Sequence, residues 1–416
     1  MARHLKLRSF LGASLFSLVA ATSAFAQEQP TVDVVHWLTA GAEQAAISVL
    51  AEEFERRGGT WVDSAVPGGP SDAQALVMSR VAGGNPPGVA FLSMGRSAVE
   101  LGQEGVTRDV KALAEASGLA QTSDILTKLA TDDAGAIFAL PVAIETDNLA
   151  WYSKPAYDKA GLSYPKTWDE ALAQAPKLKE AGVIPIAVGA QGWQLSILFN
   201  SILMGEAGAD TFEAIVNERS AEAAASPQVV KAFATMRALS TFADPGASNR
   251  AWNDTLNLVA DGRAAMQVMG SWAGAELTKM GKAHDVDWAC ALPPGNTKLV
   301  LEGAGFQFPT VSSEAETKGQ ELFIQVLLDP KVQADFAVAK GALPSRLDAD
   351  TSKLAPCDQM TAKVLHEAGG VPALGIVLSS DSAGQIEDLL SRFWAEASLT
   401  PEEAARQFAE LLAAAN

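Results

Sequence analysis

The first part of the chain alternates between two kinds of hydrophobic pattern. Short apolar runs predict three strands, at 32–37, 60–66 and 88–93. Segments with apolar residues on one helical face predict two helices between them, at 42–59 and 72–84. Asp72 fits the N-cap position of the second helix. This β-α-β-α-β order predicts a parallel sheet with right-handed crossovers, whose ligands bind beyond the carboxyl ends of the strands.

The remaining chain contains further strand-like runs separated by helical segments. Two apolar runs flank Pro141, and a mostly helical region from Tyr157 to Arg237 is interrupted by a short strand. Three segments have the pattern of crossings between two α/β units, at 136–153, 301–310 and 340–350. A length of 416 residues also suits two domains better than one.

The amino terminus differs from everything that follows. Arg3, Lys6 and Arg8 precede the apolar run "FLGASLFSLVAATSAFA", which ends in small residues. This pattern predicts a secretory signal peptide over residues 1–26 and a mature start at Gln27. The alternative of a membrane anchor is weaker because the run is short for a spanning helix. Since no cysteine lies near the cleavage site, we expect a freely soluble periplasmic protein rather than a lipoprotein.

Charge and cysteine content narrow the possible partners. Removing the three basic side chains of the signal segment lowers the formal net charge from −18 to −21. Such an acidic chain disfavours nucleic acid and anionic membranes as partners. In an exported protein, the two cysteines Cys290 and Cys357 favour one disulfide over two buried thiols.

Several segments resemble the extracytoplasmic solute-binding proteins of ABC sugar importers, and more narrowly their glucose- and mannose-binding branch. The resembling stretches extend over nearly the whole exported chain and include "VHWLTAGAEQAA", "SRVAGGNPPGVAF", "ALPVAIETDNLAWY", "LVADGRAAMQVMGSW" and "AKGALPSRLD". The resemblance implies an α/β periplasmic-binding-protein fold: two lobes, three interlobe crossings, and a sugar enclosed in the cleft. It also implies delivery of the sugar to a membrane permease.

The crossings set the expected boundaries of the lobes. We expect an N-terminal lobe of residues 27–141 plus 303–343 and a C-terminal lobe of residues 142–302 plus 344–416. Rotation about hinges near Pro141, Gly303 and Leu343 would close the cleft while each core stays intact.

A sugar ring requires a flat aromatic surface against its C–H face and polar groups around its hydroxyl rim. Trp37, Trp193 and Trp272 are the candidate stacking rings, and Trp252 is undecided. The other five tryptophans are assigned to packing. The candidate polar contacts are Glu43, Asn148, Gln194 and Lys340. Glu43 also suits a helix first turn, and Lys340 also suits a solvated surface position.

Four positions depart from the glucose branch as the resemblance aligns it, and the first is Leu38, which follows Trp37 where that branch has a second tryptophan. Met94 stands in place of a lysine, Glu145 in place of a histidine, and Asp381 is the nearest substitute for another histidine. These changes predict a ligand other than plain glucose. We expect a small, largely neutral saccharide or sugar derivative.

The competing function is an exported carbohydrate-active enzyme such as a glycosidase, which needs two carboxylates across a scissile bond. A ligand-sensing partner of a receptor would share the fold and the site with a transport component. The motifs H-E-x-x-H, G-x-S-x-G and the P-loop do not occur, and His36, His284 and His366 lack metal-ligand spacing. We therefore expect a monomeric binding protein without a cofactor.

Overall fold

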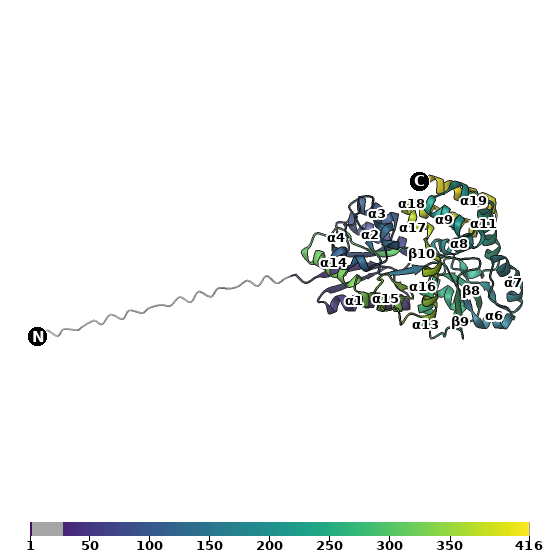
Figure 1. Cartoon of the computed structure of the whole chain (residues 1–416), viewed down its shortest axis with the longest axis horizontal. Helices are drawn as coiled ribbons and strands as arrows, with labels where there is room; N and C mark the ends of the chain where they lie inside the picture. Colours follow the sequence, from purple (N-terminus) through teal and green to yellow (C-terminus); the bar gives the residue numbers. More distant parts are fainter. Residues whose placement is uncertain (2–27, 416) are drawn as a thin grey trace.

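A computed structural model describes Met1 and residues 28–415. Apart from Met1, the predicted signal peptide at 1–26 lies outside the described residues. Within them, no helix combines the length and the hydrophobicity needed to cross a membrane. The described residues form two α/β lobes that lie side by side (Figure 1).

The first lobe is built on a five-stranded sheet with the order β2-β1-β3-β11-β4. β1 pairs in parallel with β2 and β3, as the hydrophobic pattern predicts, whereas β11 pairs antiparallel with β3 and β4. The strands are β1 Thr31–His36, β2 Thr60–Ala65, β3 Val89–Ser93, β4 Ala139–Leu140 and β11 Ala304–Gln307. The helices around this sheet are α1 Gly41–Arg56, α2 Pro70–Ala82, α3 Arg96–Gln103, α4 Lys111–Ala116, α5 Asp124–Thr127, α14 Glu314–Leu327 and α15 Pro330–Lys340.

One predicted helix boundary is wrong. α2 begins at Pro70 rather than after Asp72, and Gly69 is its N-cap. Proline is favoured in the first helical turn because its missing N–H has no intrahelical acceptor there. Asp72 is the third helical residue, and its carboxylate accepts a hydrogen bond of 3.1 Å from the Gly69 N–H.

The second lobe contains a four-stranded sheet with the order β7-β8-β6-β9. Its strands are β6 Leu149–Ser153, β7 Ile184–Ile186, β8 Ala264–Met269 and β9 Trp288–Ala291. Its helices are α6 Lys154–Ala160, α7 Trp168–Glu180, α8 Gly192–Ala207, α9 Ala209–Glu218, α10 Ala221–Ala224, α11 Pro227–Ser240, α12 Trp252–Ala260, α13 Trp272–Lys279, α18 Ser380–Ala395 and α19 Pro401–Ala414. Trp151, Trp168 and Trp288 are fully buried here, in agreement with their predicted packing role.

A third sheet lies where the chain passes between the lobes. It has the order β12-β5-β10-β13, with strands β5 Ala143–Thr146, β10 Leu299–Glu302, β12 Leu343–Pro344 and β13 Gly370–Pro372. Two helices lie near it, α16 Pro356–Ala368 and α17 Leu374–Val377. Pro141 separates β4 from β5, and Gly303 separates β10 from β11, so these residues stand where the chain leaves one sheet for the next.

The cysteines are joined as predicted. A disulfide between Cys290 and Cys357 links β9 of the second lobe to α16. It closes a loop with a sequence separation of 67 residues. In the chain-entropy model, a loop of this length adds about 4 kcal/mol to the free energy of unfolding.

Candidate functional site

A cavity of about 530 Å³ lies between the two lobes. This volume falls in the range of about 300–1,000 Å³ typical of small-molecule sites. Hydrogen bonds bridge the lobes near it, from the Ala42 N–H to Glu276 Oε2 at 2.8 Å and from Gln74 Nε2 to Ser380 Oγ at 3.5 Å. Both lobes therefore contribute to the walls of the cavity and touch each other beside it.

Four tryptophans line the cavity. Trp37 directly follows β1, and its ring packs on Phe91 with a centroid distance of 4.7 Å. Trp193 lies in the first turn of α8, while Trp252 and Trp272 begin α12 and α13. The rings of Trp252 and Trp272 meet edge to face at 6.4 Å. The undecided Trp252 thus lines the cavity together with the three predicted rings, and such rings offer apolar surfaces to a ligand.

One group of charged residues in the cavity is internally paired, and we call it the lysine cluster: Glu43, Glu145 and Lys340. Lys340, the last residue of α15, donates to Glu145 Oε2 at 2.8 Å and lies 4.0 Å from Glu43 Oε1. Its ammonium group also lies 4.8 Å from the centroid of the Trp272 ring. Because Lys340 is only 3% exposed, it is not the solvated lysine of the competing interpretation.

Glu43 has two roles in this cluster. Glu43 lies in the first turn of α1. Its Oε2 accepts hydrogen bonds from the backbone N–H groups of Thr39 and Ala40, which precede the helix, at 3.2 and 3.0 Å. Burial raises the pKa of its carboxyl group, and the charge of Lys340 partly offsets this effect. Glu43 therefore caps the helix and lines the cavity at the same time.

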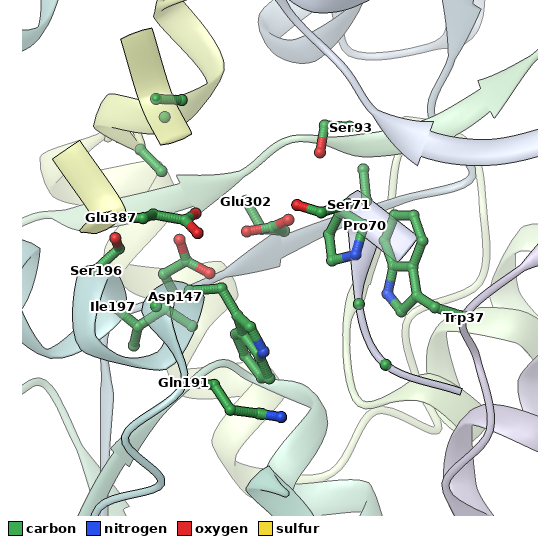
Figure 2. A pocket seen from close by; sticks show the side chains of 18 of the residues that line it. Trp37, Pro70, Ser71, Ser93, Asp147, Gln191, Ser196, Ile197, Glu302 and Glu387 are labelled. Atoms are coloured by element: carbon green, nitrogen blue, oxygen red, sulfur yellow. The ribbon is translucent and has the colours of Figure 1, made fainter. Parts of the chain in front are cut away.

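A second group of charged side chains, the acidic cluster, consists of Asp147, Glu302 and Glu387. Asp147 follows β5, Glu302 ends β10, and Glu387 lies on α18. Figure 2 shows the three carboxyl groups turned toward a common region of the cavity, opposite Trp37. Sequence reasoning did not select any of these three residues.

Burial dominates the electrostatics of the acidic cluster. It raises the pKa of Asp147 well above its usual range, and the charge of Glu302 adds to the effect. Burial likewise raises the pKa of Glu302, and it raises the pKa of Glu387 to about 7. One carboxyl oxygen of Asp147, Oδ1, is buried and has no hydrogen-bond partner among the described residues.

Two predicted polar contacts have structural roles outside the cavity. Asn148 is fully buried and joins neighbouring strands: its Oδ1 accepts from the Val300 N–H at 2.6 Å, and its Nδ2 donates to the Lys298 carbonyl at 2.9 Å. Gln194 is buried beside the cavity and donates to Gln191 Oε1 at 2.7 Å and to the Arg250 carbonyl at 2.9 Å. Gln191, rather than Gln194, lines the cavity.

Two further predicted residues are also not in the lining. Met94 is fully buried in a hydrophobic cluster, and it is the preceding residue, Ser93, that reaches the cavity. Asp381 is exposed on α18 and accepts a hydrogen bond from Gln385 within the same helix, at 2.8 Å.

The positions on α18 explain the error for Asp381. Ser380, Gly384 and Glu387 line the cavity and stand at i, i+4 and i+7, which is one face of a helix. Asp381 lies about 100° around the helix from Ser380 and points elsewhere. The same helical spacing could have selected Glu387 from the sequence.

The two α/β lobes and the cavity between them are typical of a protein that binds a small ligand. Comparison with known proteins places the chain in a family: residues 40–334 match the model for bacterial extracellular solute-binding proteins. The chain belongs to this family, which agrees with the prediction of a binding protein rather than an enzyme.

Curated relatives match over most of their length. A "probable sugar-binding periplasmic protein" of Brucella melitensis biotype 1 is 31% identical over 92% of this chain and 90% of the relative. A protein of Rhizobium meliloti (strain 1021) with the same description is 31% identical over 84% of each chain.

Solved structures confirm the predicted α/β periplasmic-binding-protein fold. A chitin oligosaccharide binding protein superposes with a TM-score of 0.79 at 20% identity, covering 93% of this chain and 99% of that one. The maltose-bound MalE3 of T. maritima gives a TM-score of 0.76 at 18% identity, with coverage of 92% and 99%.

Proposed function

We propose that this protein binds a small carbohydrate between its lobes and delivers it to the membrane permease of an ABC importer. The observation that carries the proposal is the interlobe cavity of about 530 Å³, which combines four tryptophan rings with charged and amide side chains. A pyranose needs this combination of apolar surface and hydrogen-bond partners. The sugar-binding descriptions of the Brucella and Rhizobium relatives support the same conclusion.

The lobes of the proposed transporter component are residues 27–141 plus 303–343 and residues 142–302 plus 344–416. Ligand-driven closure takes place about Pro141 and Gly303, where a strand of one sheet gives way to a strand of the next, and about Leu343, where β12 follows α15. The protein acts as a monomer in the periplasm, without a lipid anchor, cofactor or nucleic-acid partner. Permease and chemoreceptor roles would use the same site.

The site contacts that we propose are six of the candidates predicted from the sequence, together with Trp252. Trp37, Trp193, Trp252 and Trp272 offer stacking surfaces, and Glu43, Glu145 and Lys340 present hydrogen-bonding groups. The resemblance to the glucose- and mannose-binding branch, which the Asn85-Pro86-Pro87 turn and the paired cysteines sharpen, supports a ligand of mono- or disaccharide size.

A thermal-shift panel on ligand-stripped protein tests this function. We expect monosaccharides or disaccharides to raise the unfolding temperature, because a ligand present at 100 times its Kd stabilises the folded state by about 2.7 kcal/mol. The variant Trp37→Ala should weaken the response, and Trp394→Ala, whose ring lies outside the cavity, should not. A response confined to amino acids or peptides would refute the sugar assignment. Chromatographic recovery of an unchanged sugar distinguishes binding from hydrolysis by a glycosidase.

A further inference from the structure

The charges that line the cavity do not balance. Among the described residues, the lining contains one basic side chain, Lys340. The acidic side chains of the lining are Glu43, Asp72, Glu145, Asp147, Glu302 and Glu387. Lys340 is committed to Glu145 and Glu43 in the lysine cluster. Within the described part of the chain, none of the three carboxylates of the acidic cluster forms an ion pair with a basic side chain.

Asp147 and Glu302 hydrogen-bond each other, which two carboxyl groups can do only when one of them holds a proton. Asp147 is only 3% exposed, and its Oδ1 still lacks a hydrogen-bond partner among the described residues, which is costly for a buried polar atom. Three carboxyl groups gathered in one place add to this cost because their negative charges repel one another. An incoming ligand can supply the missing positive donor.

We infer that the ligand carries a positively charged nitrogen that binds among Asp147, Glu302 and Glu387. The inference rests on the proposed function and narrows the ligand to an amino sugar or another amine-bearing sugar derivative. It revises the largely neutral ligand that the sequence favours.

The surroundings of the acidic cluster suit an organic cation. The cavity also holds tryptophan rings, whose faces attract ammonium groups. A bare metal ion fits less well. Among the described residues, the one group of three metal-ligating side chains whose ligand atoms lie within 4.8 Å of one another is His284, Cys290 and Cys357, and its cysteines are disulfide-bonded. The carboxylates of the acidic cluster are thus spread more widely than a metal ion requires.

Binding of such a cation is coupled to protons. Burial raises the pKa of each carboxyl in the cluster, so the empty site retains protons that a cation displaces. The charged groups facing the cluster are Glu145 and Lys340 beside Glu302, and Asp388 beside Glu387. Proton release means that affinity should rise with pH between about 5 and 6.5, where an amino-sugar amine with a pKa near 8 stays charged.

The test is a matrix of matched sugars on ligand-stripped full-length exported protein. Glucose, galactose, mannose and cellobiose are each compared with the 2-amino-2-deoxy form and the N-acetylated form, by calorimetry at pH 6.5. N-Acetylation keeps the nitrogen and removes its charge. In at least one series, we expect the amine to bind about tenfold tighter or more than both neutral forms. Proton release is measured by repeating the titration in buffers of different ionisation enthalpy.

Two variants link the preference to the acidic cluster. Asp147→Asn should reduce the ratio of amine to neutral affinity by about tenfold, whereas the exposed Asp381→Asn on α18 should leave the ratio unchanged. Glu302→Gln gives the same comparison if Asp147→Asn does not fold.

Each outcome decides a different point. Neutral sugars that bind as tightly as their amines in every responding series would overturn the cationic ligand and leave the sugar function standing. An unchanged ratio in both cluster variants would also overturn it. If no sugar in the matrix binds, the proposed function fails, and the inference fails with it.

Discussion

The lysine cluster and the acidic cluster line the same cavity, but their buried carboxyl groups differ in the partners that the fold gives them. Lys340 lies 2.8 Å from Glu145, and Glu43 accepts two backbone N–H groups, so the first cluster is satisfied by the fold. In the acidic cluster, Asp147 and Glu302 hydrogen-bond only each other, no ion pair with a basic side chain forms among the described residues, and burial raises the pKa of each member. The comparison separates charges that shape the cavity from charges that are positioned for a ligand.

The largest effect should come from removing the cation of the satisfied cluster. Lys340→Met leaves Glu43 and Glu145 buried without their counter-charge. Removing one partner of a buried ion pair costs about 3–5 kcal/mol, so we expect a loss of this size in the free energy of unfolding at pH 7. Urea denaturation of ligand-free protein measures it.

Two controls sharpen this prediction. Lys128→Met removes an exposed lysine from an i,i+4 pair with Asp124 and should change stability by no more than about 0.5 kcal/mol. Adding Glu145→Gln to Lys340→Met should recover part of the loss. A Lys340→Met protein as stable as the Lys128→Met protein would show that the lysine cluster does not support the fold.

The acidic cluster should instead make the empty protein less stable as pH rises. Burial raises the pKa of Glu387 to about 7 from an ordinary value of 4.5, so the folded state holds this proton after the unfolded chain has lost it. The free energy of unfolding should therefore fall between pH 4.5 and 7, by up to roughly 3 kcal/mol. Glu387→Gln should flatten this part of the profile.

Denaturation profiles of wild type, Glu387→Gln and Glu402→Gln in the same buffers provide the measurement. Glu402 is exposed on α19, and its variant should follow the wild-type slope. Parallel profiles for wild type and Glu387→Gln would contradict the assignment of the slope to the acidic cluster.

Asn148 directly follows Asp147 in the chain, but its side chain supports the fold, whereas that of Asp147 lines the cavity. Its side chain joins Thr146, Lys298 and Val300, so Asn148→Ala would leave buried backbone groups without partners. We expect a loss of about 2 kcal/mol in the free energy of unfolding, against little change for the exposed Asn257→Ala. If Asn148→Ala weakened sugar binding without lowering stability, its role would be in the site rather than in the fold.

Much of the fold was predictable from sequence because it follows local periodicity. The three strands at 31–36, 60–65 and 89–93 and their parallel pairing follow from short apolar runs separated by amphipathic helices. Trp37 was identifiable because a strand end fixes where the next side chain lies. The register of short segments such as β12 depends on long-range pairing, which periodicity does not encode.

The site was only partly predictable because its chemistry depends on which face each polar residue presents. The sequence indicates a polar segment at 145–148 but not that Asp147 reaches the cavity while Asn148 turns into the protein. Lys340 was found through the family resemblance, whereas Glu302 lies in a crossing that attracted attention only as a hinge. Met94 was assigned by alignment, yet its side chain packs into the core.

The smallest effect should come from Asp381, which tests whether position in the fold or position in the sequence decides function. Asp381 and Glu387 share α18, but Asp381 is exposed and interacts with Gln385. Asp381→Asn should lower the free energy of unfolding by about 0.5 kcal/mol, because it removes a negative charge from the first turn of a helix. Since its side chain lies outside the lining, the affinity for any sugar that binds should change by less than about twofold, or roughly 0.4 kcal/mol. Calorimetric titration of Asp381→Asn beside Glu387→Gln measures both quantities on one helix. A larger loss of affinity for Asp381→Asn than for Glu387→Gln would reverse the assignment and restore Asp381 as a ligand contact.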